Sequence, residues 1–144
     1  MINQLKIYTI FRREAAKRRS YCRRALRLLK KQAFYNCKNI ENITLPQTLW
    51  KIDDMALWGC EKIKKLELTS KISSVGSYVF RDCKALEEII VVPENTYFKS
   101  VDGILYEKKK YMRMMVCPAM KQGIVTVADG MHEIGTEHFM TVNM

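Results

Sequence analysis

At 144 residues the chain has room for one domain, and its 48% apolar content is ordinary for a chain that buries a core. Its net charge of +10 is local, since residues 1–31 carry eleven Lys or Arg and one Glu, while residues 32–144 carry fourteen bases and fourteen acids. No run of about 18 apolar residues occurs, so no membrane-spanning helix is expected. The five cysteines are an odd number, which excludes a disulfide framework that uses all of them.

Residues 1–32 are expected to form a basic amphipathic helix that caps the rest of the chain. Apolar residues from Tyr8 to Leu29 recur mostly at intervals of three, four or seven, and no Pro or Gly interrupts them. The segment does not resemble a secretory signal, because Arg12 and Arg13 stand where a small-residue cleavage site is required. Taken from Met1, the sequence therefore predicts a cytoplasmic protein.

The basic side chains of this segment are candidate contacts with nucleic-acid phosphates or with an anionic membrane. Two other interpretations stay open: a solvated cap helix, or a remnant left by a misplaced start codon or a truncated gene. The candidate residues are Arg12, Arg13, Lys17, Arg18, Arg19, Arg23, Arg24 and Arg27.

Residues 33–92 repeat with a period of 23, marked by Cys37, Cys60 and Cys83. The apolar residues recur in the same columns: Phe34/Leu57/Phe80, Ile40/Ile63/Leu86, Ile43/Leu66/Ile89, Leu45/Leu68/Val91, Leu49/Ile72 and Ile52/Val75. A fixed period in the twenties indicates a stacked array, in which each unit buries its apolar residues against its neighbours. The expected fold is therefore a solenoid of about four units.

Each unit is expected to contain one short strand, because its apolar residues end in strict alternation. The side chains between the buried ones must face solvent in two ladders, Asn42/Lys65/Glu88 and Thr44/Glu67/Ile90. These six residues are either a solvated sheet face with a Lys65–Glu88 pair or the contact surface for a partner.

Two further features complete the expected unit. The spacing of Ala33, Phe34, Cys37 and Ile40 favours a single helical turn, and Leu26 and Leu29 precede Leu49 and Ile52 by one period, which indicates a degenerate first half-unit. The column Asp53/Gly76/Gly135 is expected to mark a corner with positive φ, which these residue types tolerate.

The period breaks over residues 93–123. Asp102-Gly103, flanked by apolar residues, predicts a hairpin. The repeat pattern resumes between Val125 and Phe139.

The sequence offers little for catalysis. A 23-residue translation lays the cysteines in a line rather than around one point, so buried thiols are favoured over a metal site, although a disulfide between neighbours stays open. The two histidines, His132 and His138, accompany no nucleophile motif, and His138 occupies a small-residue position of the repeat. No enzyme activity, metal or cofactor is expected.

The repeat resembles the BspA-like leucine-rich-repeat proteins, whose unit reads AFxxCxxLxxIxIPxxVxxIGxx. Residues 33–52 follow this unit, and residues 95–106 match the family's recurrent form NxxFxSxDGVLY, so that the resemblance covers roughly residues 33–139. None of the departures from the unit places a charge in an apolar column: Leu57, Asp53, Val79, His138, Thr69 and Ala128.

The resemblance implies a stack of parallel strands with short helical turns and a role in binding other molecules. It also implies the cell surface and adhesion, against the cytoplasmic interpretation of the N-terminus. We expect a non-enzymatic protein-binding module, with a fragment of a larger surface protein left open. The alternative is a scaffold whose basic helix contacts nucleic acid or membrane.

Overall fold

The computed structural model describes residues 26–108, 112–121, 125 and 127–134. Nine strands occur in this part of the chain, and no helix does. Their bounds are β1 Leu28–Leu29, β2 Lys51–Ile52, β3 Lys65–Leu68, β4 Ser74–Val75, β5 Glu88–Val91, β6 Phe98–Val101, β7 Ile104–Glu107, β8 Met112–Val116 and β9 Met131–Ile134. No helix in the described residues is long and apolar enough to cross a membrane.

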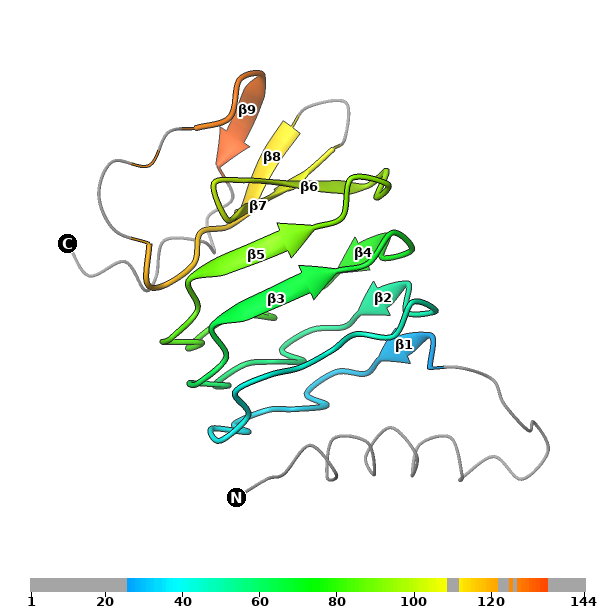
Figure 1. Ribbon diagram of the computed structural model, residues 1–144, viewed down its shortest axis with the longest axis vertical. Coiled ribbons are helices and arrows are strands. Elements are labelled where there is room, and N and C mark those ends of the chain that lie inside the picture. The colour runs from blue at the N-terminus through cyan, green and yellow to red at the C-terminus, as the bar shows by residue number, and fades with distance from the viewer. Residues whose placement is uncertain (1–25, 109–111, 122–124, 126, 135–144) are drawn as a thin grey trace.

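The strands stack as parallel ladders with the period of the sequence (Figure 1). One sheet joins β1, β2 and β4, with Leu29 opposite Ile52 and Ile52 opposite Val75. A second joins β3 and β5, with Leu66 opposite Ile89. Each register step is 23 residues, which confirms the solenoid, and the Leu29 register confirms that the repeat begins before residue 33.

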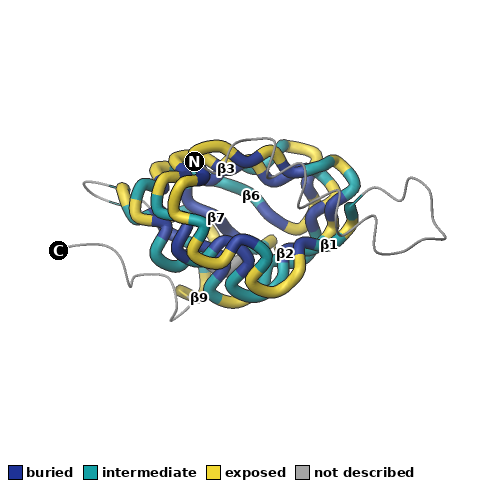
Figure 2. The backbone as a smooth tube through the Cα atoms, turned by 90° about the horizontal axis from the view of Figure 1, so that it is seen from below, coloured by how far each residue is buried: buried dark blue, intermediate teal, exposed yellow. Residues whose placement is uncertain are grey.

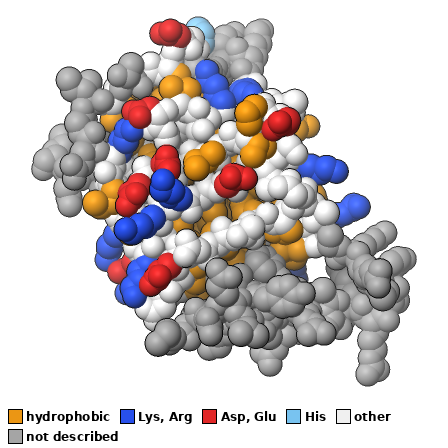
Figure 3. All heavy atoms as spheres, viewed as in Figure 1, with side chains coloured by type: hydrophobic (Ala, Val, Ile, Leu, Met, Phe, Trp, Pro, Cys, Tyr) orange, Lys and Arg blue, Asp and Glu red, His pale blue; other side chains and the backbone are white. Residues whose placement is uncertain are grey.

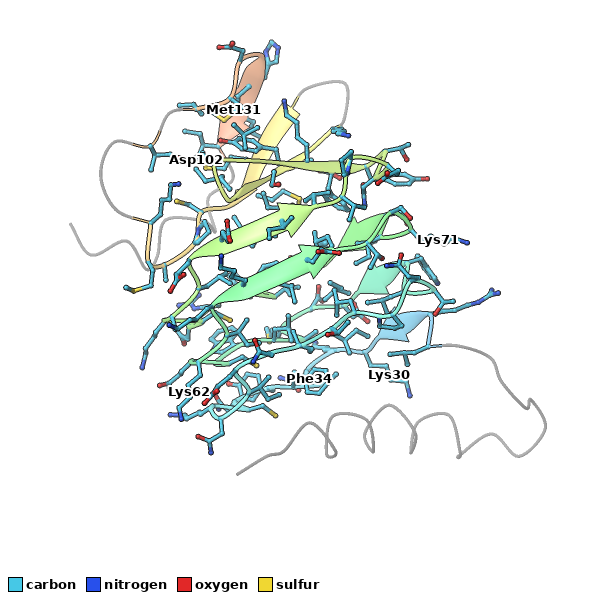
Figure 4. The ribbon with its side chains drawn as sticks, viewed as in Figure 1. Lys30, Phe34, Lys62, Lys71, Asp102 and Met131 are labelled. Carbon is cyan, nitrogen blue, oxygen red and sulfur yellow. The ribbon has the colours of Figure 1, made fainter. Side chains whose placement is uncertain are left out.

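Each unit forms a flattened ring when viewed along the stack, with β3 on one long side and β1 and β2 on the other (Figure 2). Lys62 lies at the corner that leads into β3, and Lys71 lies at the corner that follows it (Figure 4). The ring is filled by the apolar columns: Phe34, Leu57, Ile63 and Leu66 are each at most 2% exposed. Burial of these columns between neighbouring units is what holds the stack together.

The helix expected over residues 1–32 is wrong for 26–32, where β1 and a turn occur, and residues 1–25 lie outside the described residues. Leu28–Leu29 is drawn into a strand because β2 offers it a parallel partner. The domain boundary at residue 32 stays a prediction.

The expected helical turns are also wrong. Successive β-turns replace them, closed by hydrogen bonds such as Cys37 N–H to the Phe34 carbonyl (3.0 Å). The other amides of these segments donate to the next unit, as Leu57 N–H does to the Val79 carbonyl (3.2 Å). Bonding between units therefore replaces the hydrogen bonds that a helix would make within itself.

Positive φ occurs away from the predicted corner. Asp53 and Gly76 lack it, and it falls instead on two other columns of the repeat: Gln32/Met55/Tyr78 and Asn36/Gly59/Asp82. Gly76 is needed for space, since a Cβ there would lie 2.6 Å from the Asp54 backbone nitrogen. Gly135 lies outside the described residues.

After β5 the parallel ladders of the repeat give way to a separate four-stranded sheet. Strands β6 and β7 form the predicted hairpin, with Val101 opposite Ile104 and positive φ at Asp102 and Gly103. The hairpin tip lies against β5, because the Ile89 N–H donates to the Gly103 carbonyl (2.9 Å). Strands β8 and β9 extend this sheet in the order β6-β7-β8-β9 and enclose a small second core.

Candidate functional site

The predicted strand face lies on β3 and β5. The parallel register places Lys65 beside Glu88 and Glu67 beside Ile90, as the sequence predicts. Lys65, Glu67 and Ile90 are exposed, and Glu88 is half-buried. Figure 3 shows this side of the molecule, where acidic and basic side chains lie next to one another with apolar side chains between them. We call Lys65, Glu67, Glu88 and Ile90 the strand face.

Asn42 and Thr44, which were also predicted on this face, are exposed but do not lie in a strand. Ile43 and Leu45 between and after them are buried, so the alternation holds. The ladder is therefore two strands wide in the described residues.

Charges near the strand face are compensated between units. Four ion pairs each join residues 23 apart: Lys38–Glu61 (2.9 Å), Glu61–Lys84 (3.4 Å), Lys64–Glu87 (3.8 Å) and Lys65–Glu88 (2.5 Å). The hydrogen bond from Lys38 lowers the pKa of Glu61, and the hydrogen bond to Glu88 raises the pKa of Lys65. The alternation of sign down each column therefore favours the observed stacking register and leaves the face almost neutral.

The basic segment lies almost wholly outside the described residues. Of its eight candidates only Arg27 is described, and its side chain is exposed while its carbonyl accepts a hydrogen bond from the Trp50 N–H (2.9 Å). Phosphate or membrane contact through this segment stays a prediction.

The cysteine column is a row of free thiols in the described residues. The Cys60 thiol donates to the Phe34 carbonyl (3.2 Å), and the Cys83 thiol donates to the Leu57 carbonyl (3.2 Å). Burial raises the pKa of both thiols to about 12, so they stay protonated at neutral pH. These cysteines therefore tie one unit to the next and are poor nucleophiles. The described residues hold no cluster of metal-ligating side chains.

A second face was missed by the sequence analysis. Tyr35, Trp58 and Arg81 form one 23-residue column on the turn segments, and Tyr78 lies three residues before Arg81. The turn segment follows β2 directly and occupies the long side of the ring across from β3. We call these four residues the turn face. The sequence carries the signal as a further 23-residue column, apart from the buried columns and the strand columns.

The turn face is held in place by contacts between units. The Trp58 ring lies 5.9 Å from the rings of both Tyr35 and Tyr78, with tilted planes. The Arg81 guanidinium lies over Trp58 at 4.9 Å and over Tyr78 at 5.5 Å. The Trp58 indole N–H donates to an Asp82 carboxylate oxygen (3.0 Å), which fixes the ring. Tyr35 remains 42% exposed, so the column ends in an open aromatic surface.

Comparison with known proteins agrees with this repeat architecture. The profile described as a BspA type leucine rich repeat region in six copies matches residues 20–102. A leucine rich cell surface protein from Faecalibacterium prausnitzii is 20% identical with a TM-score of 0.68, over 76% of this chain and 29% of that protein. The pneumococcal vaccine antigen PcpA is 27% identical with a TM-score of 0.64, over 69% of this chain and 25% of that protein.

The chain thus spans less than a third of either protein's length. No curated protein matches it. The matched repeat region covers more than half of the 144 residues, and the chain therefore belongs to the BspA-type leucine-rich-repeat family.

Proposed function

We propose that this chain is a non-enzymatic protein-binding module of adhesion type, and that the strand face is a contact surface for its partner. The observation that carries the proposal is the parallel register of β3 and β5, which sets exposed Glu67 directly beside exposed Ile90. A flat surface that combines apolar and charged side chains suits a non-obligate protein interface.

The chemistry of the described side chains supports binding over catalysis. The Cys60 and Cys83 thiols are buried and protonated. The carboxylates of Glu61 and Glu88 are engaged by lysines. A catalytic acid, base or nucleophile requires instead a group whose proton affinity is matched to its task and which a substrate can reach.

The solved structures that this chain resembles support a role at a cell surface. One is described as a cell surface protein and the other as a vaccine antigen, and both are much longer than this chain. We extend to this chain a role in contacts at a cell surface.

A photocrosslinking experiment tests the proposal. Benzoylphenylalanine replaces Glu67 or Ile90 in the full chain, and the control places it at Lys71, which is exposed on the corner after β3. The labelled chain is irradiated with extracts of the source organism and of the cells that surround it. We expect the strand-face positions to give discrete protein adducts. Equal labelling from all three positions, or no adduct from Glu67 and Ile90, would count against a strand-face contact.

Substitution then measures the contribution of the face. Lys65→Ala with Glu67→Ala should weaken binding of the crosslinked partner at least tenfold, whereas Lys71→Ala with Glu94→Ala should leave it unchanged. Unaltered affinity of the strand-face variant would remove this surface from the proposal.

The basic segment is a separate proposal with its own test. Retention of the full chain on heparin or on anionic vesicles should weaken with salt and be lost when residues 1–25 are deleted. This deletion leaves Leu28–Leu29 of β1 in place. Unchanged retention after the deletion would refute both contacts.

A further inference from the structure

The turn face has the composition of a binding hot spot. Its members are two tyrosines, one tryptophan and one arginine, the residue types that most often dominate the energy of protein interfaces. The strand face is built largely from Lys and Glu, which are depleted at interface cores. The turn face lies across the ring from the strand face, so the two surfaces contact different parts of a partner, or different partners.

Arg81 gives this surface a charge preference. Its guanidinium packs on Trp58 and Tyr78, and it makes no ion pair among the described residues. Asp82 is adjacent in sequence, but its carboxylate accepts the Trp58 indole N–H. A planar guanidinium that is held on aromatic rings has few rotamers left to lose on binding, and its N–H donors fit a carboxylate in pairs.

The charges near Arg81 indicate which class of partner the turn face suits. A nucleic acid or an anionic membrane is held by many cations together, whereas the neighbouring units pair Lys38 and Lys84 with Glu61. A guanidinium without an ion pair among the described residues, beside the half-buried ring of Trp58 and the exposed ring of Tyr35, instead matches a single carboxylate next to an apolar side chain. A short peptide segment offers both groups.

We propose that the turn face binds an extended peptide segment of a partner protein, in which an Asp or Glu pairs with Arg81 and a neighbouring apolar side chain packs on Tyr35 and Trp58. The inference rests on the proposed protein-binding function, but it uses a different surface. The acidic residue provides specificity, and the aromatic rings provide most of the buried apolar area.

The test begins with random twelve-residue peptides displayed on phage and selected on the full chain. We expect the selected sequences to be enriched in Asp or Glu next to an apolar residue. Synthetic peptides of these sequences are then titrated against the Trp50→Phe variant, in which Trp58 is the only tryptophan, because the chain has two. The expected result is a saturable change in Trp58 fluorescence. The matched control is Trp58→Phe, in which Trp50 reports and should not respond.

Substitutions then assign the binding energy. Arg81→Gln should weaken peptide binding at least tenfold, and Arg81→Lys should restore only part of it because an ammonium lacks the planar fork. Lys71→Gln, which removes one exposed positive charge outside both faces, should leave peptide affinity unchanged. Replacing the peptide's acid with Asn or Gln should reproduce the loss seen with Arg81→Gln, and the double change should add little.

Several results would overturn the inference. Selected peptides without acidic enrichment, or peptides whose binding survives Arg81→Gln and is lost in Lys65→Gln, would move the peptide site to the strand face while leaving the protein-binding function intact. Binding of an acidic oligosaccharide such as a hyaluronan hexamer through Arg81 and Trp58, with no peptide selected, would assign the surface to a glycan. If neither probe binds and no partner crosslinks to the strand face, the protein-binding function itself fails.

Discussion

The strand face and the turn face are made by the same 23-residue period, yet they have opposite chemistry. Down the strand columns charge changes sign from unit to unit, so Lys65 pairs with Glu88 and Lys64 with Glu87. Down the turn column, aromatic side chains repeat and end beneath Arg81, which keeps its charge unpaired among the described residues. One face thus pairs its charges between units, whereas the other holds an arginine on aromatic rings without an ion pair among the described residues.

The largest expected effect tests whether the two faces share one core. Leu57 lies beneath the turn face and Leu66 beneath the strand face, and both are at most 1% exposed. Leu57→Ala and Leu66→Ala should each lower the free energy of unfolding by about 2–5 kcal/mol, because each leaves a cavity in a filled ring. Urea denaturation measures both. A cost near zero for one of them would show that its side of the ring packs loosely.

The next effect concerns the turn segment that carries Trp58. Gly59 has a φ of 72°, and a Cβ at this position would collide with the Asn36 side chain of the preceding unit. Gly59→Ala should cost about 2 kcal/mol of unfolding free energy from the two causes together. The control is Gly130→Ala, with a φ of 78° and no atom of the described residues within 4 Å of its Cβ, which should cost about 1 kcal/mol.

Adding Asn36→Ala to Gly59→Ala separates the collision from the backbone cost. In the Asn36→Ala background, Gly59→Ala should lower the free energy of unfolding by no more than Gly130→Ala does. If Gly59→Ala lowers the free energy of unfolding as much in this background as in the unmodified chain, the whole effect comes from backbone conformation.

A separate effect concerns the thiols and depends on pH. Burial raises the pKa of Cys60 and Cys83 from 9.0 to about 12, so between these values the folded chain holds thiol protons that the unfolded chain has lost. The contribution of the two thiols to the free energy of unfolding should therefore be fully present below about pH 9 and be lost as the pH rises toward 12.

Urea unfolding at pH 8, 9.5 and 10.5 measures this slope. A Cys60→Ala/Cys83→Ala variant should show a shallower slope, while the loss of lysine charge, which weakens ion pairs such as Lys64–Glu87, affects both proteins alike. Equal slopes in the two proteins would show that the thiols do not resist ionisation.

The smallest effect is on the strand face. Lys65→Gln breaks the Lys65–Glu88 pair, whose lysine side chain is 61% exposed. Exposed ion pairs contribute little to stability, so thermal unfolding should be nearly unchanged. A clear drop in Tm would give the strand face a larger role in holding the stack together than its exposure suggests.

The buried half of each unit could be predicted because every apolar column obeys the period. Leu66, Ile63 and Phe34 are buried as expected, and the Asp102-Gly103 hairpin follows from local turn chemistry. Residue type and spacing are sufficient where the same environment recurs in each unit.

The turns could not be predicted from apolar spacing, because intervals of three and four fit both a helix and successive β-turns. The column Asn36/Gly59/Asp82 held the missing signal, since these residue types tolerate the positive φ that a helix forbids. Met55 and Tyr78 gave no such signal. Their positive φ is imposed by stacking, as when the Met55 N–H donates to the Ser77 carbonyl of the next unit (2.9 Å).

The most direct test of the division between the two faces is an amide chemical-shift map of the full chain, labelled with ¹⁵N and titrated with a selected acidic peptide. We expect the largest shifts in the turn segments, at residues 34–37, 57–60 and 78–82, and at the Trp58 indole N–H, with small shifts in β3 and β5. Shifts concentrated in Lys65–Leu68 and Glu88–Val91, with an unmoved Trp58 indole signal, would contradict it.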